Sequence, residues 1–289
     1  MEDGHESNLV YALVYGCILA LGLPLNAVSL WILLRRHNLK SPSVVFMVNL
    51  ALSDLLLAIS LPMRVHFYAT GTWSLGNELC IWTTMLFHNN IRSSSIFITF
   101  ISVDRLLAVL YPLRSRHLRT ASNALKAVVL AWLFVGVLNI PERLEFSMFF
   151  KRKNNSTCFE FQHNVTINNN NRHYHKSAST YVSSMLELIL LAVNVVGTTL
   201  VSWTLRRHLT DSASVNNKVN VMLIFIMNMM MFIICFLPMA VVLLLYGLPV
   251  STPLLCLASF NCCLDPLLYY FSLDAFWKKK EDIELAREQ

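Results

Sequence analysis

Hydrophobic residues along this chain gather into long blocks that are separated by short polar segments. A helix of about 20 apolar residues is long enough to cross the hydrocarbon core of a bilayer. Blocks of at least this length cover residues 8–34, 43–68, 77–110, 121–141, 178–208, 219–245 and 250–271. The pattern therefore predicts an all-α membrane protein, built as a bundle of seven transmembrane helices.

Composition and charge support this class and give the bundle a direction. The chain is 55% hydrophobic and 14% charged, whereas soluble domains carry about a quarter charged residues. Of the 23 lysines and arginines, fifteen lie on one predicted side of the membrane, six on the other and two inside blocks. The more basic side is expected to be cytoplasmic, which places the N-terminus of this multi-pass membrane protein outside.

The segment between the fourth and fifth blocks carries two independent marks of an exterior location. Asn154, Asn155 and Asn164 each begin an Asn-X-Ser/Thr glycosylation pattern. Cys158 lies in the same segment, and Cys80 lies at the outer end of the third block. Because both cysteines face an oxidising space, we expect a disulfide between them.

Polar residues inside the blocks need a partner or a task, because hydrocarbon does not solvate them. The strongest examples are Asp54 in the second block and the adjacent pair Asp104–Arg105 at the inner end of the third. Prolines recur as well, and Pro238 and Pro266 each remove a backbone hydrogen bond where a helix is able to bend. Such features are typical of a bundle whose helices move.

The ordered set of these motifs resembles the rhodopsin-like (class A) G-protein-coupled receptors over essentially the whole chain. The matching positions are Asn26, Leu50–Asp54, Asp104–Arg105–Leu106, Trp132, Cys235–Pro238 and Asp265–Tyr269. The resemblance divides the chain into an extracellular N-terminus at 1–7, a receptor domain at 8–272 and a cytoplasmic tail at 273–289. Within that tail, residues 274–280 look like a short amphipathic eighth helix on the inner leaflet.

The resemblance also implies a mechanism. An extracellular ligand would shift a two-state bundle, Arg105 would leave an ionic lock with Asp104, and the opened end would bind a heterotrimeric G protein, with arrestin as a further partner. The remaining switch residues implied are Phe236, Pro238, Asp265, Pro266 and Tyr269. An allosteric sodium site, the one cofactor expected, is implied at Asp54, Ser94 and Asn261.

Three positions depart from the family pattern. Leu106 stands where an aromatic residue is usual, the block at 178–208 lacks the common proline, and Trp203 replaces an expected tyrosine. These departures concern the efficiency of the activation switch.

Within the family, the chain looks most like the non-Edg lysophosphatidic acid receptors. The segments that carry this likeness are Leu61–Arg64, Ser102–Leu113, His117–Thr120 and Asn261–Pro266. An anionic lysophospholipid is therefore the expected ligand, and residues 239–245, which carry no charge, suit an acyl chain better than a triphosphate. A phosphate head group needs cations, and Arg64 near the outer end of the second block is the best candidate.

Further ligand-binding candidates lie on the third and fifth blocks and between them. Phe87, His88 and Arg92 follow one another along the third block, and Lys176 could add to a basic rim. We expect Arg92 either to contact the ligand or to pair internally with Glu187.

Other functions are weighed against this one. Within the receptor class they are a nucleotide receptor, a receptor for another lipid, a proton sensor that uses the outer histidines, and an orphan receptor. A transporter would show internal repeats with broken helices, and an enzyme would need a nucleophile with its base or metal ligands. Neither pattern is evident, so the chain is predicted not to be an enzyme.

Overall fold

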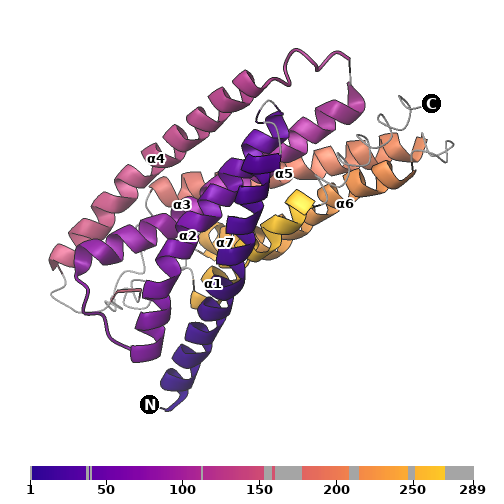
Figure 1. Cartoon of the computed structure of the whole chain (residues 1–289). Coiled ribbons are helices and arrows are strands. Elements are labelled where there is room, and N and C mark those ends of the chain that lie inside the picture. Colours follow the sequence, from indigo (N-terminus) through magenta and orange to yellow (C-terminus); the bar gives the residue numbers. More distant parts are fainter. Residues whose placement is uncertain are drawn as a thin grey trace.

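Long helices make up the computed structural model, and the part of the chain that it describes contains no strand (Figure 1). The residues described are 2–36, 39, 41–111, 113–152, 158–159, 178–207, 215–246 and 251–270. Within them, 7 helical segments are long and apolar enough to cross a membrane. This confirms the predicted class of a seven-helix membrane bundle.

Each of the first five spans is a single helix, whereas the sixth and seventh are divided. The first five are α1 (Glu2–Arg36), α2 (Pro42–Thr70), α3 (Asn77–Leu110), α4 (Ala121–Arg152) and α5 (Ala178–Arg207). The sixth consists of α6 (Val215–Met231), η2 (Phe232–Phe236), α7 (Leu237–Val241) and η3 (Val242–Tyr246). The seventh consists of α8 (Thr252–Ser259), a turn at Phe260 and a helix over 261–270.

The sequence-based prediction is wrong about the outer end of the fourth span, because it ends this span too early, at Pro141. The helix continues to Arg152, and its membrane-spanning stretch reaches Met148. Membrane helices tolerate an interior proline when neighbouring groups satisfy the freed backbone. Arg143, beyond this proline, lies 3.6 Å from the Glu78 carboxylate and over the Trp82 ring on α3. These contacts hold the extension against the bundle.

The structure describes the chain from residue 2 onward but does not describe the residues after 270. α1 begins at Glu2, so the predicted N-terminal segment continues into the first helix. The predicted amphipathic helix at 274–280 and the three glycosylation asparagines lie outside the described residues. They remain predictions.

Pro238 lies at the place where the sixth span changes its helical geometry. A proline has no N–H and its ring pushes against the carbonyl four residues earlier. The chain widens into the π-helical turn η2 directly before α7, which contains Pro238. Pro62 and Pro141, in contrast, lie inside uninterrupted helices. The backbone hydrogen bonding of the sixth span is therefore already altered at its proline.

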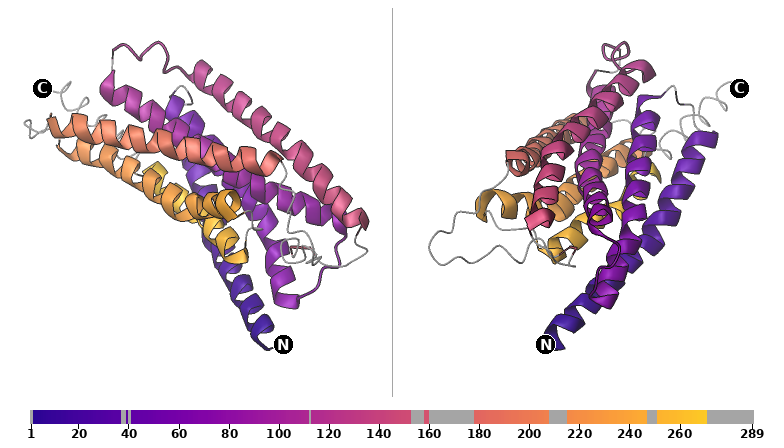
Figure 2. Two further views of the ribbon diagram at one scale, coloured as in Figure 1. Left: turned by 180° about the vertical axis from the view of Figure 1, so that it is seen from behind. Right: turned by 90° about the vertical axis from the view of Figure 1, so that its left-hand side faces the viewer.

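α3 lies at the centre of the bundle, where it contacts α2, α4, α5, α6, η2 and α8. The views in Figures 1 and 2 agree that α5 and α6 run side by side on one side, while α1 lies against α2 on the other. Because α3 has neighbours on all sides, its polar side chains meet other helices and not lipid. This arrangement places the candidate site residues of α3 in the interior.

The contact between α1 and the seventh span depends on a small residue. Asn26 donates a hydrogen bond to the Cys262 carbonyl at 2.7 Å and another to the Gly22 carbonyl at 3.0 Å. A Cβ atom added to Gly22 would lie 2.8 Å from the Cys262 sulfur. Small residues at membrane helix interfaces allow backbones to approach closely, and Gly22 serves this purpose here.

We predict that Gly22→Val destabilises the bundle by about 1–3 kcal/mol, because its side chain has to push α1 away from the seventh span. The measurement is the thermal unfolding midpoint of the purified protein in detergent. Gly16→Val is the matched control, since nothing lies within 4 Å of a Cβ atom at Gly16. Equal midpoints for the two variants would contradict the prediction.

Candidate functional site

Arg64, on the outer part of α2, is a buried cation enclosed by aromatic rings. Its side chain is 1% exposed. The guanidinium carbon lies 4.1 Å from the Phe87 ring centre and 4.4 Å from that of Phe159. Its Nε has no hydrogen-bond partner, and no described carboxylate lies within ion-pair distance of it. Arg64 is thus a positive charge with aromatic contacts but no described counter-ion.

The predicted disulfide between Cys80 and Cys158 is confirmed, with 5.7 Å between their Cα atoms. It fixes Cys158 to the outer end of α3. Phe159 is the next residue after Cys158, so the disulfide holds its ring near Arg64. The sequence analysis did not single out Phe159; its position beside a predicted disulfide was the available signal.

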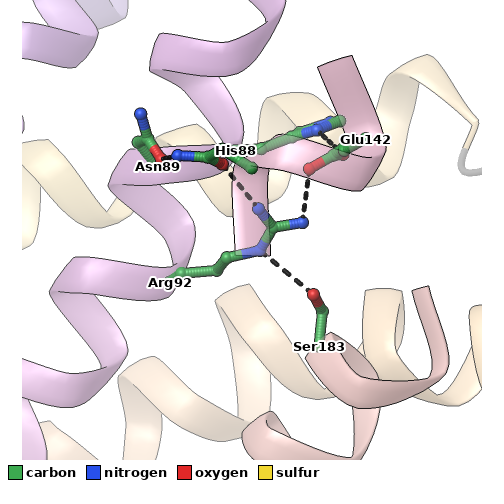
Figure 3. A network of polar contacts seen from close by, with 6 residues as sticks. His88, Asn89, Arg92, Glu142 and Ser183 are labelled. Atoms are coloured by element: carbon green, nitrogen blue, oxygen red, sulfur yellow. Dashed lines mark hydrogen bonds and ion pairs between the residues drawn. The ribbon is translucent and has the colours of Figure 1, made fainter. Parts of the chain in front are cut away.

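Arg92 belongs to a polar network that joins α3, α4 and α5 (Figure 3). Its Nη2 pairs with Glu142 at 2.7 Å, its Nη1 donates to the Asn139 amide oxygen at 2.9 Å, and its Nε donates to the Ser183 hydroxyl at 3.1 Å. His88 pairs with the other carboxylate oxygen of Glu142. Every nitrogen of this guanidinium therefore has a partner within the protein.

Of the two alternatives expected for Arg92, the direct ion pair with Glu187 is not formed, and the two side chains interact only through their charges. Glu187 instead accepts a hydrogen bond from Ser95 at 3.0 Å, and its second oxygen has no partner. Ser95 lies almost one turn further along α3 than Arg92. The acid that pairs with Arg92 is therefore Glu142. The sequence analysis did not consider Glu142 because the predicted fourth span ended at Pro141.

A second cluster lies deeper, around Asp54 on α2. One Asp54 oxygen accepts hydrogen bonds from Asn90 at 2.9 Å and Ser94 at 3.5 Å. The other accepts no hydrogen bond from a described donor, and neither does either oxygen of Asp265, although the two carboxyl groups lie within hydrogen-bonding reach of each other. Asn261, fully buried about one turn before Asp265, also has unpartnered side-chain oxygen and nitrogen atoms.

At the inner end of α3, Asp104 and Arg105 attract each other through their charges, but the ion pair that Asp104 forms in this structure is with another residue. The Asp104 carboxylate pairs with Arg119, which lies in the loop between α3 and α4, at 2.8 and 3.2 Å. The Ser43 hydroxyl also donates to it. Consecutive residues on a helix do not face each other, so Asp104 and Arg105 point in different directions. The buried Nε of Arg105 has no partner.

The remaining switch candidates lie in the interior of the sixth and seventh spans. Phe236 is fully buried and its ring meets the edge of Phe232, with 5.4 Å between ring centres. Tyr269 is 2% exposed and its buried hydroxyl has no hydrogen-bond partner. Pro266 is buried between Asp265 and Tyr269 on the same helix. Lys176, the last ligand candidate, lies outside the described residues.

Asn139, Glu142 and Ser183 are the network members that the sequence analysis did not single out. Asn139 and Glu142 are three positions apart, so they share one face of α4. An acid and an amide at helical spacing in an apolar block would have indicated this network if the block had been extended past Pro141. Nothing comparable marks Ser183, because serine is common in membrane helices.

The sequence of this chain is similar to those of known proteins. Residues 25–269 match the family described as 7 transmembrane receptor (rhodopsin family). Human lysophosphatidic acid receptor 4 is 35% identical over 96% of this chain and 78% of its own length. Chicken lysophosphatidic acid receptor 6 is 32% identical over 94% and 92%, respectively. Mouse proteinase-activated receptor 1 is 30% identical over 90% of the chain and 62% of its own length.

The family match covers most of the chain, from the first span to the end of the seventh. The relatives match it over nearly its whole length at 30% identity or more. Both findings agree with the seven-helix bundle and with the order of motifs along it. They also agree with the prediction that the chain is not an enzyme. The protein is a multi-pass membrane protein and belongs to the rhodopsin-like family of seven-transmembrane receptors.

Proposed function

We propose that this protein is a plasma-membrane receptor with an extracellular N-terminus, that it binds an anionic lysophospholipid of the lysophosphatidic acid type, and that it activates heterotrimeric G proteins. Arg64 carries the proposal: it is a buried cation with no described counter-ion, near the outer end of α2. A charge in this position is costly without an anionic partner. A phosphate head group would supply that partner. Relatives named lysophosphatidic acid receptors support the same ligand class.

Arg92 is not part of the proposed head-group site. Its guanidinium nitrogens are already occupied by Glu142, Asn139 and Ser183. A ligand phosphate would have to break an ion pair whose partner carboxylate is largely buried. We therefore assign Arg92 to the structural network and Arg64 to the ligand.

The inner end of the bundle supports the proposed coupling to a G protein. Arg105 is half-buried and its inaccessible Nε has no partner, while Asp104 is held by Arg119 and Ser43. An arginine free of a tight ion pair is able to change partners when the helices move apart. We infer that the G protein, and arrestin after it, would engage this end.

The first prediction concerns Arg64. Arg64→Gln should raise the half-maximal concentration of lysophosphatidic acid about 10- to 100-fold, because charge-assisted hydrogen bonds to the phosphate would be lost. The measurement is G-protein dissociation in cells, with surface expression quantified in parallel. Arg143→Gln is the matched control, since Arg143 is an exposed arginine near the outer end of α4.

Parallel titrations with nucleotides and with pH separate the competing receptor functions. If the lysolipid gives no response while a nucleotide or protons give a saturable one, the proposed ligand is wrong and that agonist takes its place. An unchanged response in Arg64→Gln would keep the ligand and remove Arg64 from its site.

The second prediction concerns the network around Arg92. Glu142→Gln should lower stability by about 3–5 kcal/mol, because it leaves a largely buried guanidinium without its counter-charge. Arg92→Gln in the same chain should recover part of this loss. Thermal unfolding of the purified receptor measures both effects, and Glu145→Gln, an exposed acid on the same helix, provides the control. Additive losses in the double variant would refute the pairing.

We further propose that Asp54, Ser94 and Asn261, with Asp265, hold an allosteric sodium ion. The unpartnered oxygens of Asp54, Asn261 and Asp265 fit a hard cation, which prefers oxygen ligands. The bound ion would supply positive charge between two buried carboxyl groups. It would thereby favour the closed bundle.

The third prediction tests this cation site without an agonist. Sodium chloride should raise the thermal unfolding midpoint of the purified receptor above its value in choline chloride at equal ionic strength. Asp54→Asn should abolish the difference, because it removes a carboxylate from the site. A sodium effect that persists in this variant would place the ion elsewhere.

A further inference from the structure

The aromatic rings around Arg64 restrict the directions from which an anion can approach it. Phe87 on α3 and Phe159 beyond α4 each lie within 4.5 Å of the guanidinium carbon, and the Tyr15 ring centre lies 5.8 Å away. Such rings attract a cation through their faces. They also fill space beside the guanidinium that an oxyanion would otherwise be able to enter. Hydrogen bonds to guanidinium run in its plane, and its buried Nε is unpartnered.

Phe159 is held in place by contacts that do not involve Arg64. The disulfide at Cys158 anchors the preceding residue to α3. The ring of Phe159 meets Phe67 and Trp73 edge to face, with 5.4 and 5.5 Å between ring centres. Trp73 is fixed in turn by a hydrogen bond from its indole to the Gly76 carbonyl at 2.8 Å. The ring is therefore positioned before any ligand arrives.

We propose that Phe159 and Phe87 are positioning residues, which together form an aromatic clamp on Arg64. The clamp fixes the plane of the guanidinium and presents its Nε edge for side-on recognition of an oxyanion. This inference rests on the proposed function, since it specifies the geometry with which that same site would bind its ligand. Phe159 is the new member, because no motif of the chain assigns it a role.

The geometry selects a chemical class of head group. Nε–H and one Nη–H form two parallel donors, which match two oxygens on one atom. A phosphate monoester, a phosphonate or a carboxylate provides such a pair with an open approach. A phosphodiester that carries a choline cation has a bulky group on that phosphate and no net negative charge. The clamp should therefore favour a terminal monoester, and lysine at position 64 should not replace arginine.

Progressive fluorination of the Phe159 ring tests the clamp, because it weakens the attraction of the ring for a cation with little change in ring size. Mono-, di- and trifluorophenylalanine are introduced at position 159 by amber suppression. The half-maximal concentration of lysophosphatidic acid is expected to rise stepwise, reaching roughly 3- to 30-fold for the trifluoro ring. The same series at Phe46, whose ring meets Phe100 far from Arg64, should show no trend.

A second readout separates this inference from the proposed function. The thermal unfolding midpoint of the ligand-free receptor should also fall along the Phe159 series, and this trend should vanish in the Arg64→Gln background. If the wild type ignores lysophosphatidic acid while this midpoint trend persists, the ligand is wrong and the clamp stands. A flat series in both readouts, with a responding wild type, overturns the clamp and leaves the ligand. Wild-type potency in Arg64→Lys would overturn the side-on geometry.

Discussion

Hydrocarbon offers no hydrogen bonds, and this constraint governs how the polar residues of the bundle are arranged. A polar group inside the membrane has to find its partner on another part of the protein. The central helix α3 meets this demand, since it contacts most of the other spans. Its Arg92 pairs toward α4, its Asn90 bonds to Asp54 on α2, and its Asp104 accepts from Ser43. The bundle is thus organised by which neighbour satisfies each polar position of α3.

The contact between α3 and α5 shows how the same constraint holds a helix that lacks the usual proline. Three side-chain hydrogen bonds of 2.8–3.1 Å join the two helices at successive depths: Arg92–Ser183, Ser95–Glu187 and Thr99–Asn194. On each helix the positions are about one or two turns apart, so they form one polar seam along the interface. α5 itself is unbroken from Ala178 to Arg207. The seam aligns α5 with α3. In a helix with the family's common proline, the kinked backbone would contribute to that alignment.

The sequence predicts the spans well, because hydropathy reports directly on what a helix faces. It also predicts the Cys80–Cys158 disulfide, since both residues lie on the same outer side. It fails where a side chain has a choice between neighbouring helices. Spacing along α3 shows that Arg92 lies inside the bundle, but whether it reaches Glu142 or Glu187 depends on the rotation and depth of α4 and α5. The end of α4 fails for a related reason: a proline signals termination only where nothing else satisfies the freed backbone.

The contrast between paired and unpaired buried groups separates structural residues from binding residues. Both Arg64 and Arg92 are buried arginines on neighbouring helices, yet Arg92 has a partner for every guanidinium nitrogen, whereas the Nε of Arg64 has none. Asp54 and Asp265 resemble Arg64 in this respect but carry acidic groups, because carboxylate oxygens on both accept no hydrogen bond from a described donor. A receptor that switches between states needs groups whose partners arrive from outside the chain, because a ligand shifts an equilibrium only by its differential interactions with the two states. An unpaired cation near the outer end of α2 and unpaired acids at mid-depth therefore provide separate points at which an anion and a cation act on one bundle.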